Sequence, residues 1–153
     1  MNGQIELRDS AATGNLRRNL NGALILPGDK DYERERHVWN GLIDTRPAAI
    51  VRPANATNVA RVVAFAGDNQ LLLAVRSGGH SPAGHGTVDG GILVDLSAMK
   101  ALHIDPKRRV AQAQSGLTWG EYAAAAQAHD TEMATVKGMY QEVRYLHLLA
   151  PYL

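Results

Sequence analysis

The apolar positions of this chain predict a strand, a helix and a second strand in succession. Residues 48–53 form a short apolar run that ends at a proline, which is typical of a strand. Residues 56–69 predict a helix, because apolar side chains recur at the spacing of one helical face. That face is formed by Val59, Val62, Val63 and Ala66. Residues 71–75 are continuously apolar, as in a strand that is covered on both sides of a sheet.

Polar residues and glycines mark where these and the following elements end. We expect the Thr57 hydroxyl to cap the N-terminus of the helix and Gly67 to end it. Residues 91–99 predict another strand. Residues 101–105 and 108–116 predict a hairpin, because the Asp-Pro pair between them suits a type I turn.

The rest of the chain completes the predicted fold. Residues 118–130 predict a helix that begins with a capping box of Thr118 and Glu121. The pattern of residues 131–153 predicts an amphipathic helix. Together these elements predict an α/β (α+β) fold, in which a small sheet with a β-α-β start is followed by an added hairpin and helix.

The N-terminal residues 1–46 are polar and weakly periodic, and we interpret them as an extension of this fold. Residues 14–22 predict a short helix. A charged stretch follows, and its apolar residues Trp39 and Leu42 are expected to anchor it to a core.

Composition and charge exclude several classes of protein. The formal net charge of +1 gives no reason to expect nucleic acid or an acidic membrane surface as a partner. The chain has no cysteine, so disulfides, thiolate zinc sites and a cysteine nucleophile are excluded. No apolar run approaches the roughly 18 residues of a membrane span, and the charged N-terminus does not match a signal peptide. We therefore expect a cytoplasmic protein.

The segment RSGGHSPAGHG, residues 76–86, is the main candidate for chemistry. Its paired glycines let successive backbone N–H groups point into one concavity that suits an anion. Arg76, Ser77 and Ser81 add donors, and residues 76–88 contain no carboxylate. Because the segment follows a predicted strand, it lies where ligands of α/β proteins usually bind. A tight surface turn without a ligand explains the glycines equally well.

Other kinds of site are less well supported by the same segment. Neither GxGxxG opening a helix nor GxxxxGK[ST] is present. His80 and His85 have no third metal ligand nearby in sequence, so we predict no metal site. Ser81 lacks the G-x-S-x-G surroundings of a nucleophilic serine.

Residues 47–130 resemble the first part of the PCMH-type FAD-binding domain of the vanillyl-alcohol-oxidase superfamily. The resemblance is greatest to the berberine-bridge-enzyme-like FAD-linked oxidases. It rests on RSGGHS at residues 76–81, followed by the strand VDLSAMKAL at 94–102. This combination is more specific than a count of glycines.

The resemblance implies that FAD is the cofactor and that the glycine-rich segment surrounds its pyrophosphate with backbone amides. It also implies that His80 carries a covalent bond to the 8α-methyl group of the flavin. The implied cofactor-binding residues are Arg76, Ser77, Gly78, Gly79, His80, Ser81 and Gly84. No catalytic residue is implied, because the family's second glycine-rich segment and its substrate domain have no counterpart in this sequence.

Residues 131–153 depart from the family, and this departure leaves alternatives open. A truncated or frame-shifted member explains it best, and a natural short protein is the other explanation. We expect a lobe of an FAD-linked oxidoreductase that is incomplete for turnover. It would expose an apolar face through which homo-oligomers could form. The alternatives are a non-enzymatic nucleotide-binding or assembly module and a folded remnant without a ligand.

Overall fold

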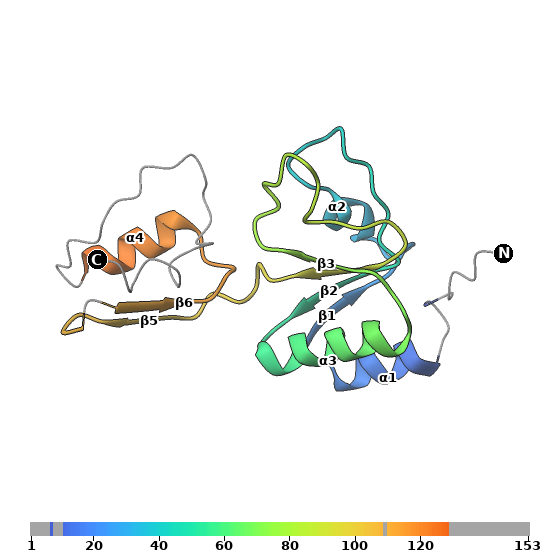
Figure 1. Cartoon of the computed structure of the whole chain (residues 1–153), viewed down its shortest axis with the longest axis horizontal. Coiled ribbons are helices and arrows are strands. Elements are labelled where there is room, and N and C mark those ends of the chain that lie inside the picture. Colours follow the sequence, from blue (N-terminus) through green and yellow to red (C-terminus); the bar gives the residue numbers. More distant parts are fainter. Residues whose placement is uncertain (1–6, 8–10, 109, 129–153) are drawn as a thin grey trace. The chain divides into compact units, whose positions relative to one another are not determined.

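The computed structural model describes residues 7, 11–108 and 110–128 of the chain (Figure 1). The chain divides into two compact units, Met1–Ala98 and Met99–Leu153. The helix predicted over residues 131–153 lies outside the described residues. No helix in the described part of the chain is long and apolar enough to cross a membrane.

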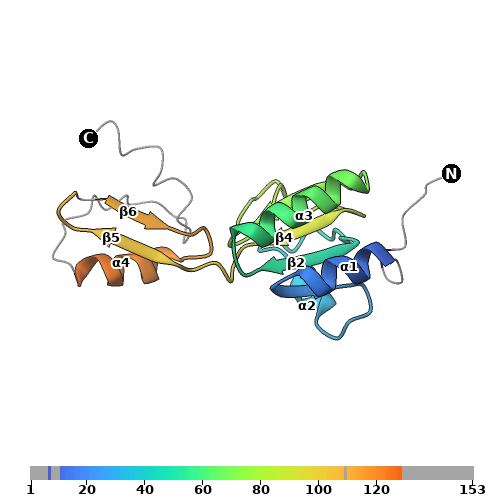
Figure 2. The same ribbon diagram turned by 90° about the horizontal axis from the view of Figure 1, so that it is seen from below.

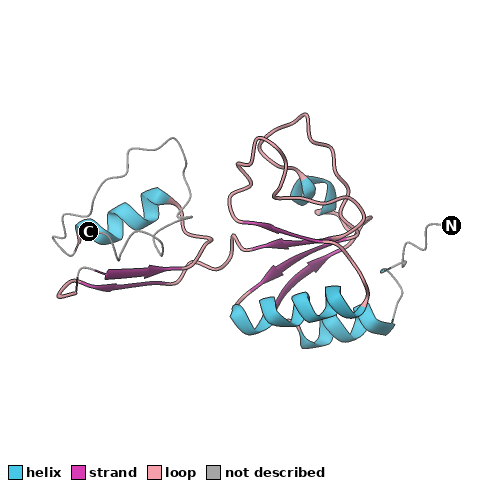
Figure 3. Ribbon diagram, viewed as in Figure 1, coloured by secondary structure: helices cyan, strands magenta, loops and turns pink. Residues whose placement is uncertain are grey.

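A four-stranded sheet forms the centre of the first unit (Figure 3). The order β1-β2-β4-β3 places β4 inside the sheet and β3 at an edge. β2, β4 and β3 run parallel, whereas β1 is antiparallel to β2. The strands are β1 (Gly22–Ile25), β2 (Ala49–Pro53), β3 (Leu73–Arg76) and β4 (Ile92–Asp95).

Helices cover both faces of this sheet (Figures 1 and 2). α1 (Ala11–Asn19) and α3 (Ala56–Asp68) lie side by side on one face, and the short α2 (Tyr32–Arg36) lies on the other. The mixed sheet between helical layers confirms the predicted α/β fold. It also makes residues before position 47 part of the same unit, because β1 pairs with β2.

Alternation along the inner strands fills both layers of the core, because successive strand side chains point to opposite faces. The layer under α1 and α3 contains Leu16, Val51, Val62, Ala66, Ile92 and Val94. The layer under α2 contains Tyr32, Ile50, Ala74 and Leu93. Burying each Leu, Ile or Val side chain of these layers stabilises the fold by about 1.5–3 kcal/mol before the loss of chain entropy is counted.

The predicted β-α-β unit is confirmed, but its second strand is less covered than its sequence indicates. Val75 in β3 is 46% exposed, and Leu72 just before the strand is 69% exposed. The strand covered on both faces is β4, in which all four residues are buried. An apolar run does not reveal this difference, because the place of a strand in the sheet depends on the path of the whole chain.

The predicted range of α3 is confirmed to within one residue, but the residues predicted to cap and to end the helix are wrong. The N-cap is Asn55, whose extended backbone (φ −158°, ψ 171°) lets its Oδ1 accept the N–H of Asn58 at 3.0 Å. Thr57 lies one residue inside the helix and is exposed. At the other end the helix passes Gly67 and closes after Asp68.

The buried face of α3 also differs by one position from the predicted face. Val63 is 51% exposed, whereas Asn58, Val62 and Ala66 are buried at intervals of four residues. A hydropathy pattern omits Asn58 because it is polar. Its burial is made possible by hydrogen bonds, one of them from the Asn21 N–H to its Oδ1 at 3.2 Å.

The N-terminal residues depart most from expectation. The short helix predicted over residues 14–22 is confirmed for residues 14–19, which lie in α1, but Gly22 already begins β1. Trp39 and Leu42 do not anchor their segment to a core, because they are 72% and 93% exposed. Tyr32 is the anchor instead: it is 2% exposed, and its hydroxyl donates to the Pro47 carbonyl at 2.7 Å.

The second unit matches the predicted hairpin and helix. β5 (Leu102–Asp105) pairs with β6 (Val110–Ala113) in antiparallel fashion, and α4 (Trp119–Gln127) follows. The capping box is confirmed, since Thr118 and Glu121 exchange side-chain-to-backbone hydrogen bonds. The small core contains Leu117 and Tyr122, packed against Leu102, Ala111, Ala113 and Trp119.

The N-cap of α3 gives a direct test of this fold. Replacing Asn55 by Ala removes acceptors for both the backbone N–H and the Nδ2 of Asn58. We expect this variant to lower the free energy of unfolding of the full chain by about 1–2 kcal/mol in urea titrations. The control is Thr57→Ala, which should change it by about 0.5 kcal/mol or less. Equal losses in the two variants would contradict the assignment of Asn55 as the cap.

Candidate functional site

The glycine-rich segment 76–86 begins at the last residue of β3, at the carboxyl edge of the three parallel strands. The register places Arg76 directly opposite Asp95 of β4. The register of β2 with β4 places Arg52 beside the same residue. Three charged side chains from three strands therefore meet where the segment starts.

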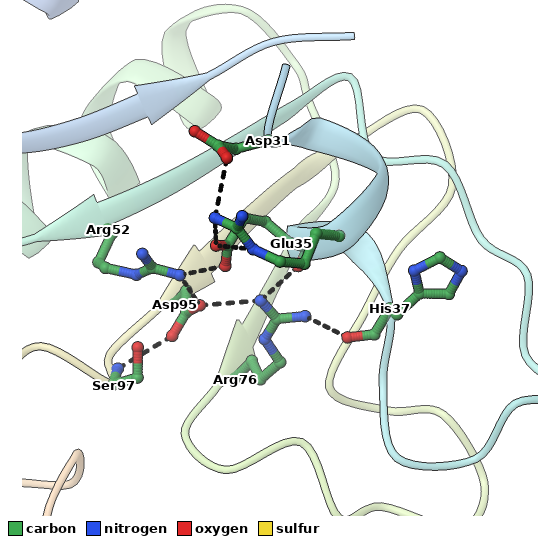
Figure 4. A network of polar contacts seen from close by, with 8 residues as sticks. Asp31, Glu35, His37, Arg52, Arg76, Asp95 and Ser97 are labelled. Atoms are coloured by element: carbon green, nitrogen blue, oxygen red, sulfur yellow. Dashed lines mark hydrogen bonds and ion pairs between the residues drawn. The ribbon is translucent and has the colours of Figure 1, made fainter. Parts of the chain in front are cut away.

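Asp95 is the centre of this polar network (Figure 4). Its Oδ2 accepts hydrogen bonds from Arg76 Nη2 at 2.8 Å and from Arg52 Nη2 at 3.1 Å, and its Oδ1 accepts from the Ser97 N–H at 2.9 Å. The Asp95 side chain is 4% exposed. Burial raises the pKa of Asp95, but the hydrogen bonds from Arg76 and Ser97 and the charge of Arg76 outweigh it. The pKa therefore lies below its usual value, and the buried group is a carboxylate.

Arg52 extends the network to α2. It forms an ion pair with Glu35, which also pairs with Arg34 at 2.8 Å (Figure 4). Burial raises the pKa of Glu35, but the hydrogen bonds from Arg34 and Arg52 outweigh it and leave the pKa below its usual value. α2 is thus tied to the sheet by charge as well as by the apolar contacts of Tyr32.

Arg76 makes a second set of contacts with the end of α2. Its Nη2 donates to the Glu35 carbonyl at 2.7 Å, and its Nη1 donates to the His37 carbonyl at 3.0 Å. Carbonyls at a helix C-terminus lack partners within the helix and favour a nearby cation. The Arg76 guanidinium therefore binds groups inside the unit, and the prediction that it donates to an anion stays untested.

Residues 37–46, here called the bracing segment, run alongside the glycine-rich segment. Three hydrogen bonds join Trp39 N to Gly79 O (3.3 Å), Asn40 Nδ2 to Pro82 O (3.0 Å), and Thr45 Oγ1 to Thr87 Oγ1 (2.7 Å). The contacts follow the same order along both stretches of the chain. Residues 39–45 are therefore held against residues 79–87.

Two glycines of the segment have backbones that other residues rarely adopt. Gly79 has φ +74° and Gly84 has φ +76°. A Cβ on Gly84 would lie 2.8 Å from Ile43 Cδ1 in the bracing segment, and a Cβ on Gly79 would lie 3.2 Å from Arg76 Cδ. These glycines are thus required both by backbone conformation and by close packing.

Contacts with Leu96, just after β4, and with the bracing segment also fix the direction of two loop peptide groups. The carbonyls of Arg76 and Gly79 accept backbone hydrogen bonds from Leu96 (2.8 Å) and Trp39 (3.3 Å). The described peptide bonds are trans, so the N–H that follows each carbonyl points to the opposite side. The N–H of Ser77 therefore points away from Leu96, and the N–H of His80 points away from Trp39. Backbone N–H groups are the kind of donor that binds the phosphate groups of a dinucleotide.

The seven predicted cofactor-binding residues all belong to this segment by sequence, and the structure shows how exposed each of them is. Arg76 and Gly79 are buried, Ser77, His80, Ser81 and Gly84 are half-buried, and Gly78 is exposed. The Ser81 hydroxyl accepts the His85 N–H at 3.2 Å and so shapes the turn. The His80 ring lies edge-on to Trp39, with ring centroids 6.5 Å apart.

Sequence reasoning missed the residues that support the segment. Taken alone, Asp95 only marks the end of a strand. Charged residues at the ends of adjacent apolar strands do signal an ion pair, and that signal could have found it. The bracing segment has no local signal, because its contacts join residues about 40 positions apart. Trp39 was expected in a core, yet it lies beside His80.

Comparisons with known proteins show the family to which the chain is similar. The FAD binding domain family matches residues 47–140. The (R)-6-hydroxynicotine oxidase of Paenarthrobacter nicotinovorans is 36% identical over 130 residues, which cover 85% of this chain and 28% of that protein.

Solved structures give the same result. 6-Hydroxy-D-nicotine oxidase from Arthrobacter nicotinovorans matches with a TM-score of 0.69 and 37% identity, over 72% of this chain and 24% of that one. BBE-like 1 from Physcomitrella patens matches with a TM-score of 0.70 over 78% of this chain and 26% of that one, and at 24% identity it shows the fold alone. The chain therefore spans about a quarter of the length of these relatives.

The buried ion pair predicts how stability depends on pH. Asp95→Asn leaves Arg76 buried without its counter-charge, so we expect the free energy of unfolding at neutral pH to fall by about 3 kcal/mol. The folded pKa of Asp95 is lowered, so its contribution is complete above the unfolded pKa and disappears as the pH falls below it. The difference between wild type and variant should be constant above pH ~5 and shrink below pH ~4.

Urea titrations at a series of pH values measure this difference. Asp105→Asn is the matched control, because this half-buried carboxyl at the turn accepts the Arg108 N–H and asparagine suits the same turn. Its stability should stay near that of wild type. A gap between wild type and Asp95→Asn that widens as the pH falls would contradict the assigned ion pair.

Proposed function

The chain belongs to the FAD binding domain family, together with the berberine-bridge-enzyme-like FAD-linked oxidoreductases, and we propose that its glycine-rich segment holds the FAD pyrophosphate. The observation that carries this proposal is the direction of the loop peptides. The carbonyls of Arg76 and Gly79 accept hydrogen bonds from Leu96 and Trp39, so the N–H groups of the same two peptides, those of Ser77 and His80, point away from these donors. Residues 76–88 contain no carboxylate that would repel a phosphate.

Each predicted residue has a role in this proposal that follows from its surroundings. Gly78 and Gly79 allow the pyrophosphate to approach the backbone, and Ser77 and Ser81 place amides and hydroxyls beside it. Gly84 closes the segment against Ile43. Arg76 acts from the protein side: its ion pair with Asp95 fixes the residue from which the segment starts.

His80 is proposed to bond covalently to the 8α carbon of the flavin. A neutral imidazole nitrogen is a nucleophile near neutral pH. Formation of the N–C bond breaks one N–H bond and one C–H bond, which releases two protons and two electrons in total. Dissolved dioxygen accepts them as hydrogen peroxide, so no other oxidant is needed.

The flavin supplies hydride chemistry when it is bound, and this chain's residues hold and orient it. Relatives named as oxidases extend well beyond the matched region, which is 28% of the first one. We propose that substrate turnover requires regions equivalent to the remainder. The chain itself would then retain FAD without oxidising a substrate.

The covalent proposal is tested by comparing the two histidines of the segment. The full chain is produced with FAD supplied, denatured in acid and analysed by mass spectrometry. We expect an FAD adduct in wild type and in His85→Ala, because the His85 side chain is exposed and has no assigned role. His80→Ala should bind FAD but release all of it on denaturation.

Two results would count against this proposal. An adduct in His80→Ala would place the link elsewhere. A wild-type chain that binds no FAD, covalently or otherwise, would favour an assembly module or a remnant without a ligand.

Backbone conformation at Gly79 gives a second test, which does not depend on the covalent link. In a His80→Ala background, Gly79→Ala forces a left-handed conformation on an L-residue and crowds Arg76. We expect the Kd for FAD to rise about tenfold, measured by flavin fluorescence titration. The control is Gly67→Ala, where an added Cβ meets nothing within 4 Å and the Kd should not change. An unchanged Kd in Gly79→Ala would contradict the proposal that this loop binds FAD.

A further inference from the structure

Trp39 is held beside the glycine-rich segment although most of its ring is exposed. Its side chain is 72% exposed, so apolar burial does not explain its position. Its backbone explains it instead, because the Trp39 N–H donates to the Gly79 carbonyl at 3.3 Å. The adjacent Asn40 side chain donates to the Pro82 carbonyl at 3.0 Å. Hydrogen bonds from the Trp39 backbone and the Asn40 side chain to loop carbonyls thus place the exposed indole next to the loop.

The neighbour of this indole is His80. The two ring centroids are 6.5 Å apart and the ring planes make an angle of 63°, which is an edge-to-face arrangement. Aromatic pairs attract one another at centroid separations of about 4.5–7 Å, because the positive edge of one ring faces the negative face of the other. The contact restricts rotation of the half-buried imidazole about its side-chain bonds.

We propose that Trp39 is a positioning residue for His80. It limits the imidazole to the orientation in which a ring nitrogen faces the 8α carbon of FAD. This inference rests on the proposed covalent link and adds the residue that controls its rate. The bond changes are those of the link itself: an N–C bond forms, one N–H and one C–H bond break, and dioxygen accepts the two electrons.

A purely structural role explains the position less well. Leu42, also in the bracing segment, is 93% exposed, so apolar side chains of this segment stay largely in solvent and add little to the core. Removing the Trp39 ring removes little buried surface. The hydrogen bond from the backbone N–H of residue 39 can still form in the Ala and Phe variants. Variants of Trp39 should therefore still fold, and the effect of the replacement should be a less restricted orientation of His80.

The test measures how fast the link forms. Flavin-free chain is mixed with excess FAD in air, samples are quenched in acid, and the adduct is quantified by mass spectrometry. We expect Trp39→Ala to slow adduct formation by roughly 3- to 10-fold, the worth of one edge-to-face pair. Trp39→Phe keeps an aromatic ring and should stay within about twofold of wild type.

Two matched controls separate positioning from general damage. Leu42→Ala removes an exposed apolar side chain from the same segment. Trp119→Phe changes the other tryptophan, which makes an edge-to-face contact with Tyr122 in the second unit. Both controls should form the adduct at the wild-type rate.

A readout of non-covalent binding completes the design. In a His80→Ala background, Trp39→Ala should leave the Kd for FAD within about twofold, because positioning of His80 no longer matters there. The inference fails if Trp39→Ala forms the adduct at the wild-type rate. It also fails if Trp39→Phe is as slow as Trp39→Ala, or if Trp39→Ala weakens FAD binding in proportion to the slower rate. A wild-type chain that binds FAD without any adduct refutes the proposed link itself, which is a distinct outcome.

Discussion

The buried ion pair between Arg76 and Asp95 is the interaction on which the rest of the site depends. Each charge loses several kcal/mol of hydration on burial, and neither would be stable there alone. Their pairing is set by strand register, which brings the ends of β3 and β4 together. Arg76 then donates its remaining bonds to the carbonyls of Glu35 and His37. One side chain therefore joins the sheet, α2 and the first residue of the glycine-rich segment.

This arrangement explains why the residues before position 47 matter to the site, although the family match begins there. The bracing segment contributes donors that bind the carbonyls of Gly79 and Pro82. Without these donors the glycines would permit many conformations, because glycine loses more conformational entropy on ordering than other residues. The glycines allow the loop backbone many conformations, and hydrogen bonds from the bracing segment stabilise one of them.

Much of the fold is predictable from local pattern, and the errors share one physical cause. The β-α-β unit, the hairpin and the capping box of Thr118 and Glu121 follow from spacing within a few residues. The capping of α3 by Asn55, the burial of Asn58 and the exposure of Trp39 depend on partners elsewhere in the chain or on backbone angles that composition does not reveal. The candidate residues of the loop were predictable because their motif is local. Their support was not, since it comes from residues about 40 positions away.

The placement of charge at this edge of the sheet also limits what the loop can bind. A carboxylate close to the start of the segment would normally oppose a phosphate. Here Asp95 is neutralised by Arg76 and Arg52 in the same network, so its charge is directed inward and offset. Residues 76–88 contain no acid, and the Ser77 N–H points away from Leu96, which lies next to Asp95. The buried ion pair thus anchors the segment and also offsets the negative charge of Asp95, which an anionic cofactor bound to the loop would otherwise meet.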